Sequence, residues 1–194
     1  MKEIPGFNES PYLKATCALL ERNYRSALQE LEKINSDESF ALNNWLYGFS
    51  VGPATLNALV WFELKDKKNW LIESERATTH LKSIVETNPL ASPVSWVNLA
   101  ICYALQGNPQ SMKSTITKVR ELTGTEYWKY RRQVECEMHI AIAYLVLGEH
   151  EKAIETLEAA SKMDGPIFLN RELDLWFIFD RLKGNPRFDA LLKD

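Results

Sequence analysis

The apolar residues of this chain recur with the spacing of an α-helix along most of its 194 residues. Trp96, Leu99 and Tyr103 follow the i, i+3, i+7 rule that gathers side chains on one face of a helix. The stretch 140–147 repeats this spacing with isoleucine, tyrosine and leucine. No segment alternates between apolar and polar residues for long enough to predict a strand. The pattern therefore predicts an all-α protein.

Glycine and proline fall where these helices are expected to end. Residues 107–109 read Gly-Asn-Pro, in which glycine suits the left-handed position after a helix, asparagine caps the next helix and proline suits its first turn. The same tripeptide returns at residues 184–186, and Gly148 stands in the equivalent place before Glu149. These positions predict tight turns between antiparallel helices.

Three stretches of the chain align on one template of helix end, tight turn and amphipathic second helix. They begin at Ala18, Tyr103 and Tyr144, and a fourth, weaker copy runs from Trp61 to Pro89. Self-similarity of this kind indicates a repeat protein, here a single domain over residues 1–194. The predicted hairpins cover residues 9–36, 54–88, 94–122 and 126–163, and a capping helical pair covers 168–193.

The copies are unevenly spaced, which predicts two insertions. The first, at about residues 42–68, is rich in aromatic residues, and Gly52-Pro53 is expected to break it into two helical pieces. The second, residues 125–134, is expected to extend a helix toward its N-terminus, with Thr125 as the cap.

These residues resemble the tetratricopeptide repeat. The fit is best over residues 137–165, where Tyr144, Gly148 and Ala153 occupy positions of the repeat pattern. The first copy departs from the pattern at Arg22, which replaces the turn glycine. The resemblance implies a right-handed α-α superhelix of about four antiparallel hairpins with a C-terminal capping helical pair.

The end of the chain carries a narrower likeness. Residues 182–188, followed by Leu191-Leu192, resemble a tail that closes tetratricopeptide regions in bacterial multidomain regulators, some with adenylyl cyclase or winged-helix output domains. No cyclase, kinase or DNA-binding segment is visible in this sequence. Whether the chain is the sensory portion of such a regulator or stands alone is left open.

The resemblance also implies where a partner would bind, because members of this family hold ligands in a concave groove lined by the first helices. The corresponding positions here are Tyr12, Val94, Val97, Ile101, Glu135, Met138, Ile142 and Leu145. A groove of this composition suits an amphipathic helix or an apolar peptide. The family's lysine–asparagine clamp for a C-terminal carboxylate is missing, since Val97 and Ile101 fill its places. The alternative is that the chain fills its own groove.

Charge and composition narrow the expected partners. The formal net charge is −3, so no basic surface argues for nucleic acid. The longest apolar stretch, residues 141–147, is too short for membrane insertion, and the N-terminus lacks an apolar leader. Three cysteines without paired spacing favour a reducing, cytoplasmic setting.

The sequence offers little candidate chemistry. The three histidines, His80, His139 and His150, have no second ligand at metal spacing, and no nucleotide-binding or hydrolase motif occurs. The basic and aromatic residues 127–132 fit an amphipathic helix with solvated cations better than a nucleic-acid site. We therefore expect no cofactor, no metal and no enzymatic activity.

The expected function is a non-catalytic protein–protein interaction or regulatory scaffold module that binds a protein or peptide segment in the apolar groove. One alternative is a small-molecule or lipid sensor in which the insertion 42–68 covers an apolar cavity. Another is a structural oligomerisation unit, and a homo-oligomer is left open. The sequence does not identify the partner.

Overall fold

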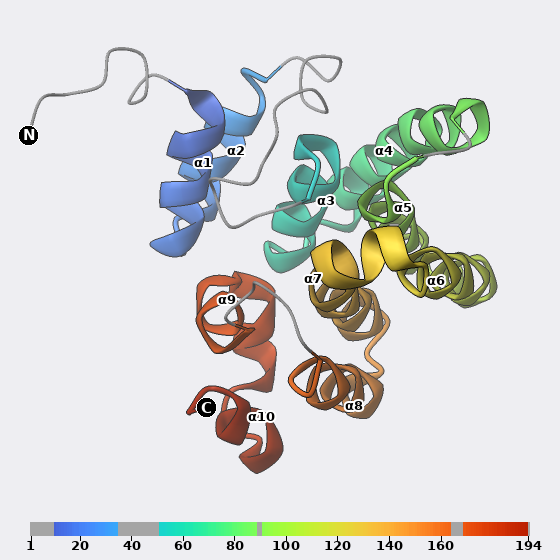
Figure 1. Ribbon diagram of the computed structural model, residues 1–194. Helices are drawn as coiled ribbons and strands as arrows, with labels where there is room; N and C mark the ends of the chain where they lie inside the picture. The colour runs from blue at the N-terminus through green and yellow to red at the C-terminus, as the bar shows by residue number, and fades with distance from the viewer. Residues whose placement is uncertain (1–9, 35–50, 89–90, 164–168, 194) are drawn as a thin grey trace, which may run out of the picture.

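The computed structural model describes residues 10–34, 51–88, 91–163 and 169–193, and every structural statement below concerns these residues (Figure 1). They form helices and no strand, so the all-α prediction is confirmed for this part of the chain. None of the helices in these ranges is both long enough and apolar enough to cross a membrane.

The helices follow one another as pairs joined by short turns. Their bounds are α1 (Pro11–Leu20) and α2 (Tyr24–Leu31), α3 (Pro53–Glu63) and α4 (Lys67–Thr87), α5 (Pro93–Leu105) and α6 (Pro109–Thr123), and α7 (Glu126–Val146) and α8 (His150–Ala160). Helix α3 begins at Pro53, and the helical piece expected before Gly52 lies outside the described residues. Helix α7 begins directly after Thr125, whose hydroxyl forms no cap and donates instead to the Leu122 carbonyl at 2.7 Å.

The C-terminal range differs from the expected helical pair, because it holds three short helices. They are α9 (Leu169–Leu175), the 3₁₀-helix η3 (Phe177–Leu182) and α10 (Pro186–Leu191). Residues 176–179 read Trp-Phe-Ile-Phe, and all four are at most 1% exposed. A solvent-facing α-helix buries only one face, so four consecutive buried residues favour an interruption and a tighter helix.

Four turns between paired helices share one backbone geometry. In each, the residue after the helix has a positive φ: Arg22 (58°), Lys65 (59°), Gly107 (67°) and Gly148 (80°). The next residue donates its backbone N–H to the carbonyl five positions earlier, as in Asn108 to Tyr103 at 2.9 Å. This is the Schellman arrangement that satisfies the last carbonyls of a helix.

The second helix of a pair then receives a side-chain cap in three of the four hairpins. The carboxamides of Asn23 and Asn108 accept the N–H groups of Ser26 and Ser111, and the Asp66 carboxylate accepts that of Asn69. Each cap satisfies a backbone donor that the helix itself cannot pair. The same local chemistry therefore makes the chain reverse at regular intervals.

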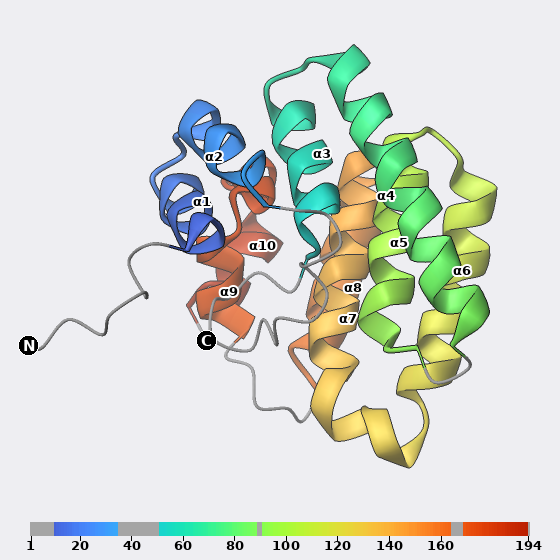
Figure 2. The same cartoon turned by 90° about the horizontal axis from the view of Figure 1, so that it is seen from above.

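Packing between the pairs is sequential. The second helix of each pair contacts the first helix of the next: α2 contacts α3, α4 contacts α5 and α6 contacts α7. The first helices α3, α5 and α7 also contact one another in that order (Figure 2). Ala100 and Ile101, on the central helix α5, are fully buried. The helices thus pack in neighbouring pairs around a continuous core.

The C-terminal segment returns to the first hairpin. Figure 1 shows α9 beside α1 and α10 beside α8. The rings of Tyr24 and Phe177 meet edge to face with centroids 5.6 Å apart. The guanidinium of Arg22 pairs with the Asp180 carboxylate at 2.7 Å and 2.9 Å. The two ends of the helical array therefore contact each other.

Candidate binding site

The structure brings most residues of the predicted groove into the core of the protein. Val97, Ile101 and Ile142 are fully buried, and Met138 and Leu145 are no more than 2% exposed. All five belong to one apolar cluster in which α5 packs against α7. Side chains in such a position are shielded from a partner in solution.

The remaining three positions are also shielded or partly shielded. Tyr12 is buried on α1, and its hydroxyl donates a long 3.5 Å hydrogen bond to the Val51 carbonyl. Burial raises its pKa. Glu135 is buried on α7, where its carboxylate pairs with Arg132. Only Val94 is half-buried, so it is the one predicted groove residue that a partner can reach directly.

The C-terminal segment occupies the surface of α7 on which the predicted groove was placed. The indole of Trp176, fully buried, packs edge to face on the His139 imidazole with ring centroids 5.3 Å apart. His139 is four residues from Glu135 and three from Ile142, so the three side chains share one helix face. The chain's own tail therefore covers this face of α7.

A polar cluster lies where α7 meets the C-terminal segment. Burial lowers the pKa of His139 to about 4, and neither of its ring nitrogens has a hydrogen-bond partner among the described residues. Burial, followed by the charge of Glu135, raises the pKa of Glu172, whose carboxylate bonds the Trp176 side chain. At neutral pH the imidazole is therefore uncharged within the core.

This cluster lacks the features of a reactive centre. Burial raises the pKa of the Cys136 thiol well above its usual range, which suppresses the nucleophilic thiolate. Cys102 is likewise buried, and its pKa rises to about 12. Within the described ranges, no three His, Cys, Asp or Glu side chains are arranged to hold a metal ion. The buried polar groups are best explained by packing.

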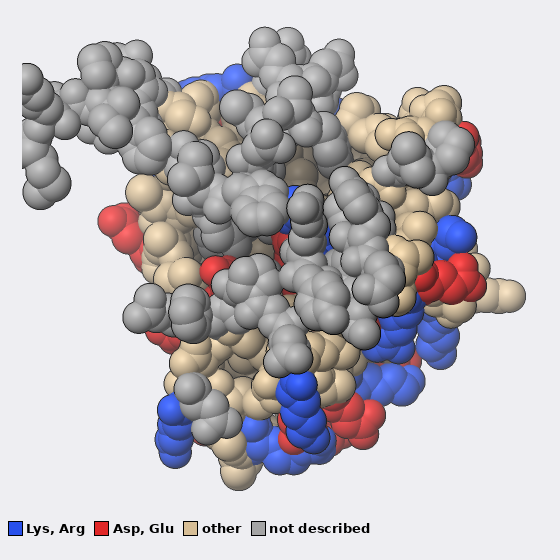
Figure 3. All heavy atoms as spheres, viewed as in Figure 1, with Lys and Arg blue, Asp and Glu red and all other residues tan. Residues whose placement is uncertain are grey.

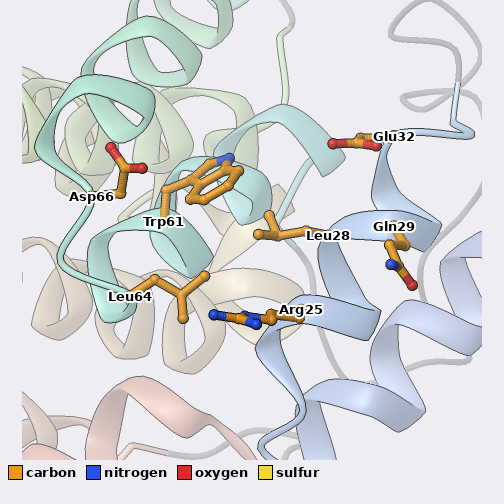
Figure 4. Close-up of a pocket in the computed structure, with 7 residues that line it drawn as sticks. All are labelled: Arg25, Leu28, Gln29, Glu32, Trp61, Leu64 and Asp66. Atoms are coloured by element: carbon orange, nitrogen blue, oxygen red, sulfur yellow. The ribbon is translucent and has the colours of Figure 1, made fainter.

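An open cleft lies instead between α2 and α3. It has a volume of about 490 Å³. Figure 4 shows the side chains that line it: Arg25, Leu28, Gln29, Glu32, Trp61, Leu64 and Asp66. Three of these residues belong to α2 and Glu32 is its C-cap, and the four recur at i, i+3, i+4 and i+7, so they lie on one face of that helix. Trp61 and Leu64 come from the end of α3, and Asp66 caps α4.

The cleft has charged ends and an apolar floor. Arg25 and Glu32 are two turns apart on α2, a rise of about 10.5 Å, and both are exposed. Neither forms an ion pair with another described residue. Leu28 and the Trp61 indole point toward each other between them (Figure 4). Leu64 remains 36% exposed at the edge.

Sequence reasoning did not select these residues. The positions taken from the resemblance come from the first helices of the hairpins, whereas Arg25, Leu28 and Glu32 belong to a second helix. A signal was present, since Trp61 falls in the aromatic insertion 42–68. The other aromatic residues of that insertion before residue 51, and the side chains of residues 127–131, lie outside the described part of the chain.

Comparison of the chain with protein families, with curated proteins and with solved structures finds no match. The resemblance to tetratricopeptide repeats therefore rests on the residues and turns described above. The repeated Schellman turns and their caps are consistent with that resemblance.

Proposed function

We propose that this chain is a non-catalytic interaction module that binds a peptide or helical segment of another protein. The observation that supports it is the series of four helix hairpins with the same turn geometry, packed in chain order. Arrays of this kind offer extended surfaces for contact. The finer arrangement proposed is a right-handed superhelix of the tetratricopeptide type, and the proposed setting is the cytoplasm, where three free thiols stay reduced.

The free-energy cost of uncovering the predicted groove favours the open cleft between α2 and α3 as the surface that a partner contacts. Uncovering the α7 face of the groove requires displacement of η3, which would expose Trp176, Phe177 and Phe179, each at most 1% exposed in the folded chain. Each buried side chain of this size contributes roughly 1.5–3 kcal/mol, so exposing the three would cost about 5–9 kcal/mol before any partner binds. Binding of a peptide in the groove would have to offset that free-energy cost. The accessible cleft between α2 and α3 requires no such opening.

Peptide selection with the purified full chain tests this function. A random peptide library displayed on phage is panned against the protein, and we expect enrichment of a recurring sequence pattern. Failure to enrich any pattern over several rounds, with the protein folded by circular dichroism, would remove the proposal.

A photo-crosslinker then locates the contact. Benzoylphenylalanine is placed at Gln29, beside the cleft, or at Val94, the accessible position of the predicted groove. Lys118, exposed on α6, serves as the matched control. We expect selected peptides to crosslink at Gln29 and not at Lys118. Crosslinking at Val94 alone would show that the peptide binds in the predicted groove and not in the cleft.

A small-molecule sensor is the second candidate, supported by one observation. Trp61, from the aromatic insertion, lines a cleft whose volume of about 490 Å³ falls in the range of ligand pockets. A thermal-shift panel of metabolites and fatty acids tests it. A ligand that raises the melting temperature and changes the fluorescence of wild type, but not of Trp61→Phe, would favour the sensor over the peptide binder.

A further inference from the structure

The unpaired charges of the α2–α3 cleft specify the chemistry of a ligand. Arg25 and Glu32 sit about 10.5 Å apart along α2, and no described residue neutralises either one. In an extended peptide, residues i and i+3 are also about 10 Å apart, because each residue spans 3.3–3.6 Å. One acidic and one basic side chain at that spacing would meet both charges at once.

The position of Trp61 favours a basic side chain at the end of the cleft that holds Glu32 and Asp66. In Figure 4 the indole lies between the carboxylates of Glu32 and Asp66. Asp66 already accepts two hydrogen bonds from Asn69, at 3.1 Å and 2.9 Å, but a carboxylate has capacity for more. An aromatic face flanked by carboxylates attracts an organic cation through both its ring and its neighbours. A lysine or arginine side chain fits there.

The apolar floor of the cleft favours apolar residues between the two charged residues of the peptide. In Figure 4, Leu28 and Leu64 both lie on the side of the indole that faces Arg25, and Leu64 is 36% exposed. Covering such apolar surface supplies the drive for binding, at about 25 cal/mol per Å². Apolar residues between the two charged ones would cover this floor.

We propose that the cleft between α2 and α3 binds an extended peptide segment with a basic and an acidic residue three positions apart and apolar residues between them. The basic side chain stacks on Trp61 between Glu32 and Asp66. The acidic side chain pairs with Arg25, and the apolar residues cover Leu28 and Leu64. This inference rests on the proposed function, because it names the partner chemistry of that same binding module.

The test uses the full chain and two short peptides. Acetyl-Lys-Leu-Leu-Glu-amide is titrated into ¹⁵N-labelled protein while the Trp61 indole N–H and the backbone amides of α2 and α3 are followed. For so short a peptide we expect a Kd of about 1 mM. The uncharged acetyl-Gln-Leu-Leu-Gln-amide is expected to bind at least about fivefold more weakly, as for loss of partly exposed ion pairs.

Variants assign the effect to the cleft. Arg25→Ala and Glu32→Ala, both exposed positions, should each weaken binding of the charged peptide about fivefold. Lys118→Ala, on α6, should leave it unchanged. Equal binding of the two peptides, no shift of the Trp61 indole, or unchanged binding by both cleft variants would overturn the inference. So would free lysine binding as tightly as the charged peptide.

The experiments distinguish a wrong assignment of the cleft from a wrong proposal that the chain is an interaction module. Library selection that enriches peptides lacking this charge pair, or peptides that do not crosslink at Gln29, would overturn the assignment of the cleft and leave the interaction module standing. Selection that enriches no peptide would remove both.

Discussion

At the residue scale, Arg22 and Lys65 occupy backbone positions that usually belong to glycine. Both have φ near +60°, a conformation that costs an L-residue about 1–2 kcal/mol. The two differ in what the side chain does. Arg22 bonds Asp180 and the carbonyls of Asp174 and Leu175, whereas Lys65 forms no ion pair with a described residue. The strain at Arg22 is therefore offset by contacts that hold the C-terminal segment.

This difference predicts opposite effects of one substitution. Lys65→Gly should raise the free energy of unfolding by about 0.5–1 kcal/mol, because it relieves the strained backbone. Arg22→Gly relieves the same strain but removes charge-assisted hydrogen bonds, so it should lower stability by about 1 kcal/mol. Urea denaturation of both variants measures this. An equal gain in both would mean that the Arg22 bonds contribute nothing.

The buried imidazole of His139 makes the free energy of unfolding depend on pH. Its folded pKa of about 4 lies below the usual 6.5, so the unfolded chain binds the extra proton first as pH falls. Stability from this group is complete above pH 6.5 and is lost between about pH 6.5 and 4, by roughly 3 kcal/mol. The raised pKa values of Glu172 and Glu63, which burial causes, oppose this loss at the acid end.

His139→Phe isolates that contribution. The phenyl ring keeps the contact with Trp176 and removes two ring nitrogens that lack hydrogen bonds. We expect this variant to be more stable than wild type at pH 7 by about 1 kcal/mol. The gap should widen as the pH falls from 6.5 to 4. Parallel stability–pH curves for the two proteins would contradict the burial of an uncharged imidazole.

At the element scale, the C-terminal segment acts as part of the core. Most of its apolar residues are buried, Trp176 packs on His139 of α7, and its charged residues reach neighbouring elements. Arg181 pairs with Glu63 of α3 at 2.8 Å, and Arg187 pairs with Glu158 of α8 at 2.6 Å. Acidic and basic side chains are intermixed on the face shown in Figure 3. The exposed ion pairs add little individually, so burial dominates the attachment.

Neighbouring residues in this segment allow a matched comparison. Trp176 is fully buried and Leu175 is 38% exposed. Trp176→Ala should lower the free energy of unfolding by about 3–5 kcal/mol, as for large aromatic residues in a core. Leu175→Ala should change it by less than about 1 kcal/mol. Urea titrations with a common m-value measure both, and similar small effects would indicate a segment only loosely attached.

At the scale of the whole molecule, local sequence patterns predicted the helices and turns but not the position of the candidate binding site. Gly107 and Gly148 marked their turns because positive φ favours glycine. The apolar period correctly predicted that the described residues are helical. The course of the tail did not follow from the same signals. Its return to Arg22 depends on contacts more than 150 positions apart in the chain, which no local pattern encodes.

The predicted groove shows the same limit. Tyr12, Val97 and Met138 were assigned to a binding surface because they stand at the positions where members of the resembled repeat family hold ligands. Spacing alone distinguishes one helix face from another but does not say whether a later segment covers that face. Here Trp176 packs on α7, and the groove positions join one core cluster. Their role in binding stays a prediction.

The central claim is that the C-terminal segment closes the array as an integral part of the core. Native-state hydrogen exchange tests it most directly, by following the amides of Trp176 and Phe179, which bond the carbonyls of Glu172 and Trp176, together with those of α7. We predict that both sets exchange only through global unfolding, with the same protection and the same dependence on urea. Exchange of the Trp176 and Phe179 amides at least about a hundredfold faster than α7 would show a segment that opens on its own, and would contradict the account.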